Sequence, residues 1–505
     1  MPETLRAVAR PGWRQAALAA GFGAVAALGL APFNLWPLAI FALAGVVWCF
    51  DRATTPRAAA LLGWAAGTGY FAVALHWIVE PFLIDIARHG WMAPFALIFM
   101  AAGLALFWGA GFLLAQWIAP RGPMRLPAFV AAITLAEMLR SVVMTGFPWA
   151  LTGHVLIGSP FLPFAAWIGP DGLTFLVWAL AAMLSLVPAQ PLRAGLPLVL
   201  VLGGLILAAP AAAPRPGEVA VDAPVLRLMQ PNAPQREKWD PRMIPVFFDR
   251  MTGFSAATPA ADLTIWPETS VPAFLDDSLR IREVIAEQAG GATSVVGIER
   301  REDGNYFNTL AVVQPDGDVG AVYDKHHLVP FGEYLPMGPL LARLGLAPMV
   351  DRFGGFTPGT GPQVIDLGPA GRAIPLICYE AVFPREIGGV AERPDMLLQI
   401  TNDAWFGTFS GPYQHLAQAR LRAVEQGLPF VRVANTGISA VIAADGTVLA
   451  SLPLGEAGFI DQPRPPAAPP TLYARIGGWP VFLLTICVLL AALTLRRRQL
   501  HLSDH

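Results

Sequence analysis

The feature that most constrains this chain is a succession of apolar, charge-poor runs through residues 15–210. A helix crosses a bilayer core with about 20 apolar residues. Only 14% of the chain is charged, against roughly 25% in an ordinary soluble domain. The sequence therefore predicts a multi-pass membrane protein. We expect eight membrane helices, at about 15–33, 36–51, 58–79, 91–118, 126–144, 161–187, 194–211 and 477–495.

The arginines between these runs predict how the chain is oriented. With the N-terminus inside, the inner segments contain most of them, namely Arg6, Arg10, Arg14, Arg52, Arg57, Arg121, Arg125, Arg193, Arg496, Arg497 and Arg498. The outer connections hold little besides Arg88 and Arg140. Since cytoplasmic loops of membrane proteins are enriched in basic residues, this asymmetry predicts cytoplasmic termini and an outer location for residues 212–474.

Two proline-rich segments enclose the outer region, at 209–217 and 462–470. Such segments form stiff, extended tethers. We therefore expect a transmembrane bundle of about seven helices over 1–211, an outer catalytic domain over 212–474, and a C-terminal helix with a basic tail over 475–505.

Strand-like and helix-like patterns alternate in the outer domain. Strands are predicted at 225–230, 262–267, 294–299, 308–314, 319–323, 374–378, 396–401, 430–434 and 438–443. Helices are predicted at about 240–256, 278–289 and 412–426. Asp316-Gly317 and Asp445-Gly446 are hairpin turn signals. This mixture predicts a layered α/β domain of the α-β-β-α sandwich type.

Three reactive side chains each follow a predicted strand of this domain. Glu268 comes after a strand and a Trp-Pro pair, Lys325 after 319–323, and Cys378 at the end of 374–378. Residues at strand ends are well placed to meet a substrate. These three are the candidate catalytic set.

Cys378 is either a catalytic thiol or an inert core cysteine. The other two cysteines, Cys49 and Cys487, fall in predicted membrane helices, too distant to form a disulfide with it. A thiol exposed to an oxidising compartment is a liability unless it is buried or used.

Lys325 and Lys238 are the two lysines of the chain, among 34 basic residues. Because arginine occupies nearly all other basic positions, a lysine here indicates that an amine is needed. The alternative is that the lysine is present by chance at a solvated position. A pair of Cys378 with His326 or His327 is the rival arrangement. Glu268 is a general base or a surface carboxylate, and the further acidic candidates are Glu333 and Glu380.

Several motifs together resemble a known family. They are Trp266-Pro267-Glu268-Thr269, the stretch 323–334 around Lys325, Cys378-Tyr379-Glu380, 401–407, 432–437, Gln230-Pro231-Asn232 with Lys238-Trp239, and Gly146-Phe147-Pro148-Trp149. The outer domain resembles the nitrilase (carbon–nitrogen hydrolase) superfamily. With its membrane helices, the whole chain resembles the apolipoprotein N-acyltransferase family.

The resemblance implies a nitrilase-like sandwich and an acyl transfer with a thioester intermediate. Glu268 would be the base, Cys378 the nucleophile and Lys325 the stabiliser of the oxyanion. Glu333 would position Lys325. Three residues would shape the pocket, namely Tyr379, Glu380 and Trp239. No metal or organic cofactor is implied.

The resemblance also implies partners and a location. The donor would be a membrane phospholipid and the acceptor a diacylated lipoprotein, with the domain facing the periplasm of a bacterial inner membrane. The segment 337–350 would be a mobile lid touching lipid, or an ordinary packed segment. The net charge of −2 gives no indication of nucleic-acid binding.

Two other functions remain open on the sequence. The first is a membrane-tethered nitrilase-type amidase, which needs the same three residues. The second is a transporter or receptor, which the few polar groups in the predicted helices disfavour.

Overall fold

The computed structural model describes residues 12–336, 343, 355–390 and 392–503. The chain divides into two compact units. One is helical and comprises residues 1–213, 409–417 and 470–505. The other is mixed α/β and comprises residues 214–408 and 418–469. The inclusion of 409–417 in the helical unit differs from the sequence-based division, which placed this segment in the outer domain.

The helical unit is built from long, closely packed helices. In its helix pairs, small residues let the backbones approach, as is usual for membrane helices. A Cβ at Gly23 would lie 1.9 Å from the Ala66 carbonyl oxygen, and one at Gly69 would lie 2.0 Å from that of Ala20. The main helices are α1 (Trp13–Ala26), α2 (Trp36–Asp51), α3 (Pro56–Ala74), α6 (Ala93–Ile118), α7 (Arg125–Arg140), α8 (Ala165–Leu186), α9 (Pro191–Ala212) and α17 (Trp479–Ser503).

Four stretches of the described chain are long and apolar enough to cross a membrane: Ile86–Ile118, Leu162–Leu186, Pro191–Ala212 and Trp479–Arg498. A fifth would be α3 together with His76–Leu83, which is bent by 63°. The helices at the other three predicted spans, α1, α2 and α7, have only 14, 16 and 16 residues. Eight crossings therefore stay a prediction, whereas a multi-pass membrane protein is supported.

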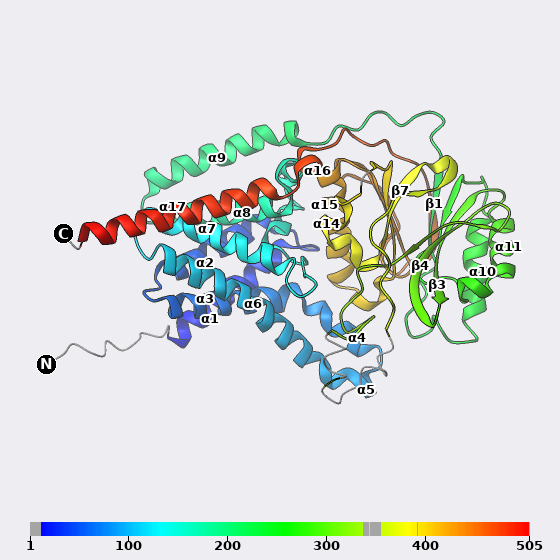
Figure 1. Ribbon diagram of the computed structural model, residues 1–505, viewed down its shortest axis with the longest axis horizontal. Coiled ribbons are helices and arrows are strands. Elements are labelled where there is room, and N and C mark those ends of the chain that lie inside the picture. The colour runs from blue at the N-terminus through cyan, green and yellow to red at the C-terminus, as the bar shows by residue number, and fades with distance from the viewer. Residues whose placement is uncertain (1–11, 337–342, 344–354, 391, 504–505) are drawn as a thin grey trace. The chain divides into compact units, whose positions relative to one another are not determined.

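The α/β unit contains two six-stranded sheets (Figure 1). In both, three central strands are parallel and the outer strands are antiparallel. The first has the order β12 (Gly458–Pro463), β1 (Val225–Gln230), β2 (Leu263–Ile265), β3 (Thr293–Glu302), β4 (Asn305–Val313) and β5 (Val319–Asp324). The second has the order β11 (Val448–Ser451), β10 (Ala440–Ile442), β9 (Phe430–Ala434), β8 (Met396–Thr401), β7 (Arg372–Ile377) and β6 (Ile365–Asp366).

An apolar core fills the space between the two sheets. Because side chains alternate along a strand, Leu310 of β4 faces this core together with Leu398 of β8, whereas Ala311 faces the other way. The second apolar layer packs the first sheet against α10 (Ile244–Ser255) and α11 (Leu279–Gln288). These two helices cover the outer face of that sheet (Figure 1). The predicted layered sandwich is confirmed.

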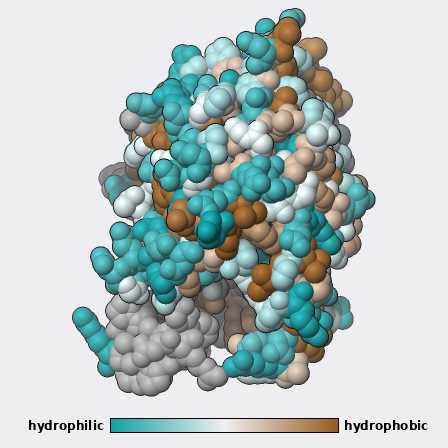
Figure 2. Space-filling view, turned by 90° about the vertical axis from the view of Figure 1, so that its right-hand side faces the viewer, coloured by the Kyte–Doolittle hydropathy of each residue, from teal (hydrophilic) through white to brown (hydrophobic). Residues whose placement is uncertain are grey.

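The face of this unit that carries α10 and α11 is largely hydrophilic, with scattered apolar side chains (Figure 2). The helical unit differs, since large apolar side chains such as Phe99, Leu192 and Leu207 are exposed on it. One unit therefore has a surface suited to water and the other a surface suited to lipid.

The sequence missed three strands, β6, β11 and β12. All three are edge strands that pair antiparallel, contain at most six residues and are for the most part not fully buried. β12 pairs with β1 from more than two hundred residues away, and no local pattern reports such pairing. The apolar segment predicted as a lid lies almost wholly outside the described residues.

Candidate active site

Glu268 lies in a tight turn that follows β2. The turn rests on Gly297 of β3, whose carbonyl oxygen accepts hydrogen bonds from the backbone N–H of Ser270 at 2.9 Å and of Val271 at 3.1 Å. A Cβ at Gly297 would lie 2.4 Å from the Pro267 oxygen and 2.6 Å from the Glu268 Cα. Only glycine allows this close approach.

The Glu268 carboxylate is buried and held from two sides. Its Oε1 accepts a hydrogen bond from Asn308 Nδ2 at 2.8 Å, and its Oε2 accepts one from the backbone N–H of Asn402 at 2.8 Å. Asn308 lies on β4 of the first sheet, whereas Asn402 follows β8 of the second. Burial raises the pKa of Glu268, although Lys325 opposes this. A carboxylate with a raised pKa is a stronger proton acceptor.

Lys325 follows β5 and points at two carboxylates. Its Nζ lies 2.7 Å from Glu333 Oε1 and 3.6 Å from Glu268 Oε1. Glu333 is itself fixed, because its Oε2 accepts from the backbone N–H of Val329 at 2.7 Å. Burial alone would lower the pKa of Lys325, but Glu333, Glu268 and Cys378 outweigh it and raise the pKa. The amine is therefore held as an ammonium.

Cys378 follows β7 in a strained backbone conformation, with φ +52°. A left-handed non-glycine residue is uncommon and persists only where neighbours hold it. Here Gln399 Nε2 donates to the Cys378 carbonyl oxygen at 2.8 Å. Burial and then Glu268 raise the pKa of the thiol, while Lys325 and a hydrogen bond with the Thr401 side chain lower it. The structure thus brings Cys378 into the field of both Glu268 and Lys325.

Glu380 joins the cysteine turn to the lysine segment. Its Oε2 accepts from the backbone N–H of Ile377 at 2.7 Å. Its Oε1 accepts from the backbone N–H of His326 at 2.8 Å and of His327 at 3.2 Å, and from the Tyr323 hydroxyl at 2.9 Å. The side chain is fully buried. Burial would raise the pKa of Glu380, but its bonds to His326 outweigh this and lower it. These contacts are the ones expected of an orienting residue, and its role at the pocket stays a prediction.

The two histidines of the rival Cys–His arrangement are engaged elsewhere. Both contact Glu386, with His327 Nδ1 lying 2.8 Å from Glu386 Oε1. His326 Nδ1 also lies 2.8 Å from Tyr323 Oη. The charged groups that influence Cys378 most are Glu268 and Lys325, with a smaller effect of Asp403.

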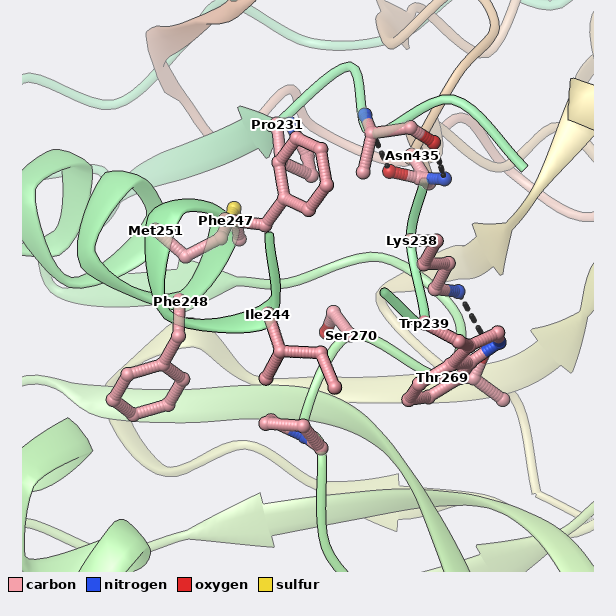
Figure 3. Close-up of a pocket in the computed structure, with 12 residues that line it drawn as sticks. Pro231, Lys238, Trp239, Ile244, Phe247, Phe248, Met251, Thr269, Ser270 and Asn435 are labelled. Carbon is pink, nitrogen blue, oxygen red and sulfur yellow. Dashed lines mark hydrogen bonds between the residues drawn. The ribbon is translucent and has the colours of Figure 1, made fainter. Parts of the chain in front are cut away.

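Tyr379 and Trp239 occupy different surroundings. Tyr379 is buried, and its ring packs edge-on against Phe383 at 5.0 Å and against His327 at 5.8 Å. Trp239 is 45% exposed and lines a small, open and largely apolar hollow next to Thr269 (Figure 3). Trp239 thus lines this hollow and Tyr379 does not, and the expected role of both at the substrate pocket stays a prediction.

Three amide residues of the site were not singled out as candidates from the sequence, although Asn402 lies within the motif 401–407. Asn308 holds Glu268 and lies 3.3 Å from Glu333, Asn402 holds the opposite oxygen of Glu268, and Gln399 holds the cysteine turn. The one available signal was a polar residue within an apolar strand, as at Asn308 and Gln399. In the part of the chain that the structure describes, no group of three His, Cys, Asp or Glu side chains is arranged to hold a metal ion.

Residues 229–469 match the carbon–nitrogen hydrolase family, and residues 22–183 match the apolipoprotein N-acyltransferase N-terminal domain. The α/β unit is thus a carbon–nitrogen hydrolase domain, carried by a chain with membrane helices. An apolipoprotein N-acyltransferase of Bradyrhizobium diazoefficiens is 39% identical, covering 97% of this chain and 96% of that protein. One from Rhodopseudomonas palustris is 37% identical, covering 96% of each. The chain belongs to the apolipoprotein N-acyltransferase family.

Among solved structures, an amidase from Nesterenkonia sp. is 20% identical and covers 52% of this chain and 95% of that chain, with a TM-score of 0.36.

Replacing Gly297 by alanine is expected to displace Glu268, because the new Cβ would overlap backbone atoms of the turn. A shift of about 1 Å costs roughly a hundredfold in rate. Acyl transfer by Gly297→Ala in detergent or nanodiscs is the measurement. Gly253→Ala is the matched control, because a Cβ there meets nothing within 4 Å. Equal activity of the two variants would show that the turn tolerates the shift.

Replacing Glu380 by glutamine is expected to lower the thermal stability and the activity together. The NH₂ of the new amide would have to face a backbone N–H group that now donates a hydrogen bond to the carboxylate. Each donor left without an acceptor costs about 1–3 kcal/mol. Because the folded pKa of Glu380 is lowered from 4.5, the ionised carboxylate stabilises the fold above pH 4.5 and loses this effect as the pH falls through the lowered value.

The control for this substitution is Glu392→Gln. Its carboxylate pairs with Arg372 on the surface, so its loss should change stability by less than about 1 kcal/mol. Unfolding curves of both variants at neutral and acidic pH make the comparison. If Glu380→Gln unfolds like Glu392→Gln, the orienting role is wrong.

Proposed function

We propose that this protein transfers a fatty acyl chain from a membrane phospholipid to the N-terminal amine of a diacylglyceryl-cysteine on lipoproteins. Cys378 is the nucleophile, Glu268 the base and Lys325 the electrostatic stabiliser. The observation that carries this proposal is the burial of one thiol, one carboxylate and one ammonium within electrostatic reach of one another. The names of the relatives support N-acylation of an apolipoprotein as the reaction.

In the first half-reaction the thiol becomes acylated. Glu268 takes the proton from Cys378 Sγ, and the thiolate attacks the ester carbonyl of the phospholipid. The oxyanion that forms is stabilised by the Lys325 ammonium. The carbon–oxygen bond of the ester then breaks, and the leaving oxygen takes the proton from Glu268. A thioester and a lysophospholipid result.

In the second half-reaction the amine of the lipoprotein attacks the thioester. Glu268 takes a proton from the attacking nitrogen and returns it to the departing Cys378 sulfur. The products are an amide and the free enzyme, so the scheme is ping-pong. No group outside Glu268, Lys325, Cys378 and the two substrates is needed to balance it.

The electrostatics of the site couple the protonation of Glu268 to that of Cys378. Burial raises the pKa of both Glu268 and Cys378, so a second anion beside an ionised Glu268 would be costly. Moving the thiol proton onto Glu268 leaves the number of charges unchanged. Lys325, fixed by Glu333, then faces a thiolate in place of a carboxylate.

The apolar helices give the helical unit a function in this scheme. Both substrates carry acyl chains, and exposing a chain to water would cost about 0.8 kcal/mol for each CH₂. We propose that the domain faces the periplasm of the inner membrane with both termini in the cytoplasm, as the distribution of arginines indicates. The diacylated acceptor and the phospholipid donor then both reach the site from the bilayer.

A membrane-bound hydrolase is the second candidate function. The match of residues 229–469 to the carbon–nitrogen hydrolase family favours it, because the same thiol and base serve hydrolysis. The two functions differ in what resolves the thioester, an amine or water.

Purified protein incubated with an alkyne-tagged phospholipid is expected to acquire a hydroxylamine-labile label at Cys378. Addition of a diacylglyceryl-cysteine peptide should move the label to the peptide amine. Cys378→Ala should abolish labelling, whereas Cys487→Ala should keep it, because Cys487 lies in the apolar helix α17. Release of the tag as free fatty acid would instead indicate the hydrolase, and labelling of Cys378→Ala would rule out this nucleophile.

The acylation rate should fall on the acidic side as Glu268 becomes protonated. Since burial raises the pKa of Glu268, the midpoint of this fall is expected above its ordinary value of 4.5. The single-turnover rate of Cys378 acylation measured against pH tests this. A rate that stays level down to pH 4.5 would exclude Glu268 as the base.

A further inference from the structure

Both lysines of the chain lie at this site. Lys325 is the ammonium beside Cys378, and Lys238 lies on the other side of the Glu268 turn. Lysine side chains are seldom fully buried, yet Lys325 is 1% and Lys238 7% exposed. The mechanism uses only the first, so the burial of the second calls for a separate explanation.

The amine of Lys238 is bound to the main chain and side chain of the turn. Its Nζ donates to Thr269 Oγ1 at 2.6 Å and to the Glu268 carbonyl oxygen at 3.2 Å. Figure 3 shows this amine directed at Thr269, beside the ring of Trp239. The Lys238 amine therefore contacts the backbone of Glu268, the proposed base.

The turn needs such support because Thr269 has φ +47°. For a β-branched residue this left-handed conformation is an outlier that costs on the order of 1–3 kcal/mol. The conformation decides where the Glu268 side chain leaves the main chain. A relaxed turn would carry the carboxylate away from Asn308 and Asn402, which hold its two oxygens.

Lys238 itself is fixed by the segment that follows β1. Its backbone N–H donates to the Pro234 carbonyl oxygen at 2.9 Å, and its Nζ lies 5.3 Å from the centre of the Trp239 ring. The hollow beside it is lined by apolar side chains of α10, among them Ile244 and Phe247. These contacts restrict the lysine to few conformations, as a rigid clamp requires.

We propose that Lys238 is a positioning residue, which clamps the strained Glu268–Thr269 turn and so directs the Glu268 carboxylate toward Cys378 and Lys325. This inference rests on the proposed function, in which Glu268 is the base. In this role Lys238 acts through the turn that carries Glu268.

The charge of Lys238 has a second effect on Glu268. Burial lowers the pKa of Lys238 to about 8, against the opposing influence of Glu268 and Glu299. Glu268 itself faces Lys325, Glu333 and Lys238, and the two lysines lower its pKa. Below about pH 8 Lys238 therefore helps to keep Glu268 ionised. Above that pH the neutral amine still has two N–H donors, so the clamp itself survives.

The test is Lys238→Met, which keeps much of the length and removes the donors and the charge. We expect the maximal rate of Cys378 acylation by alkyne-tagged phospholipid to fall roughly 10- to 100-fold. The donor concentration for half-maximal rate should stay unchanged, because the Lys238 amine is directed at the turn. The acidic midpoint of the rate should move to higher pH, because Glu268 loses a nearby positive charge.

Variants at Thr269 distinguish the loss of the Lys238–Thr269 hydrogen bond from a general loss of stability. Thr269→Val removes the acceptor and keeps the shape, so we expect a loss of about five- to tenfold, whereas Thr269→Ser keeps the acceptor and the activity. In the double variant Lys238→Met/Thr269→Val, the loss should not exceed that of Lys238→Met alone, since both act through one contact.

Three results would overturn the clamp. They are an unchanged acylation rate in Lys238→Met, a loss with an unshifted acidic midpoint, and fully additive losses in the double variant. A failure of the proposed function is distinct from these, because the wild-type protein would then acquire no label at Cys378 at all.

Discussion

The burial of two acids, Cys378 and Glu268, beside the ammonium of Lys325 is the constraint on which the rest of the site depends. Both groups are shifted toward their neutral forms by burial, and Lys325 allows one of them to be ionised. Such an arrangement works only if the three side chains stay in place without water. The two sheets provide this rigidity, because the parallel strands β2 and β7 end on the same closely packed apolar core.

The turns of the site are held by side chains that have no proposed part in the reaction itself. Two turns hold non-glycine residues at positive φ, one at Cys378 and one at Thr269. In each, a buried side chain donates a hydrogen bond to a carbonyl oxygen of the turn, from Gln399 in the first and from Lys238 in the second. Strain at the reactive residues is thus offset by neighbouring polar contacts, which is how active sites maintain such conformations.

Two buried carboxylates of the α/β unit, Glu268 and Glu380, differ in the direction of their pKa shifts. Glu268 has a raised pKa and few donors, as a base should. Glu380 collects backbone N–H groups from the cysteine turn and the lysine segment, and its pKa is lowered. The same residue type therefore serves as proton acceptor or as fixed anion, depending on how many donors the fold directs at it.

Much of this architecture could be predicted from local patterns. The apolar runs indicated membrane helices, and the alternating strands indicated a layered sandwich. The strand ends before Glu268, Lys325 and Cys378 indicated the reactive set. The number of crossings was less well determined, since α1 and α7 are shorter than the apolar runs suggested. Length alone does not separate a short membrane helix from a buried one.

The sequence by itself determined which reactive groups the chain can offer, because it has three cysteines, two of them in apolar runs, and two lysines. Only the tertiary structure decided what holds them. Asn308, Asn402 and Gln399 meet the site across strands far apart in the chain, and Gly297 is a glycine because a turn from another strand lies on it. Hydrogen bonds and close approaches of this kind depend on the pairing of distant segments, which no local pattern records.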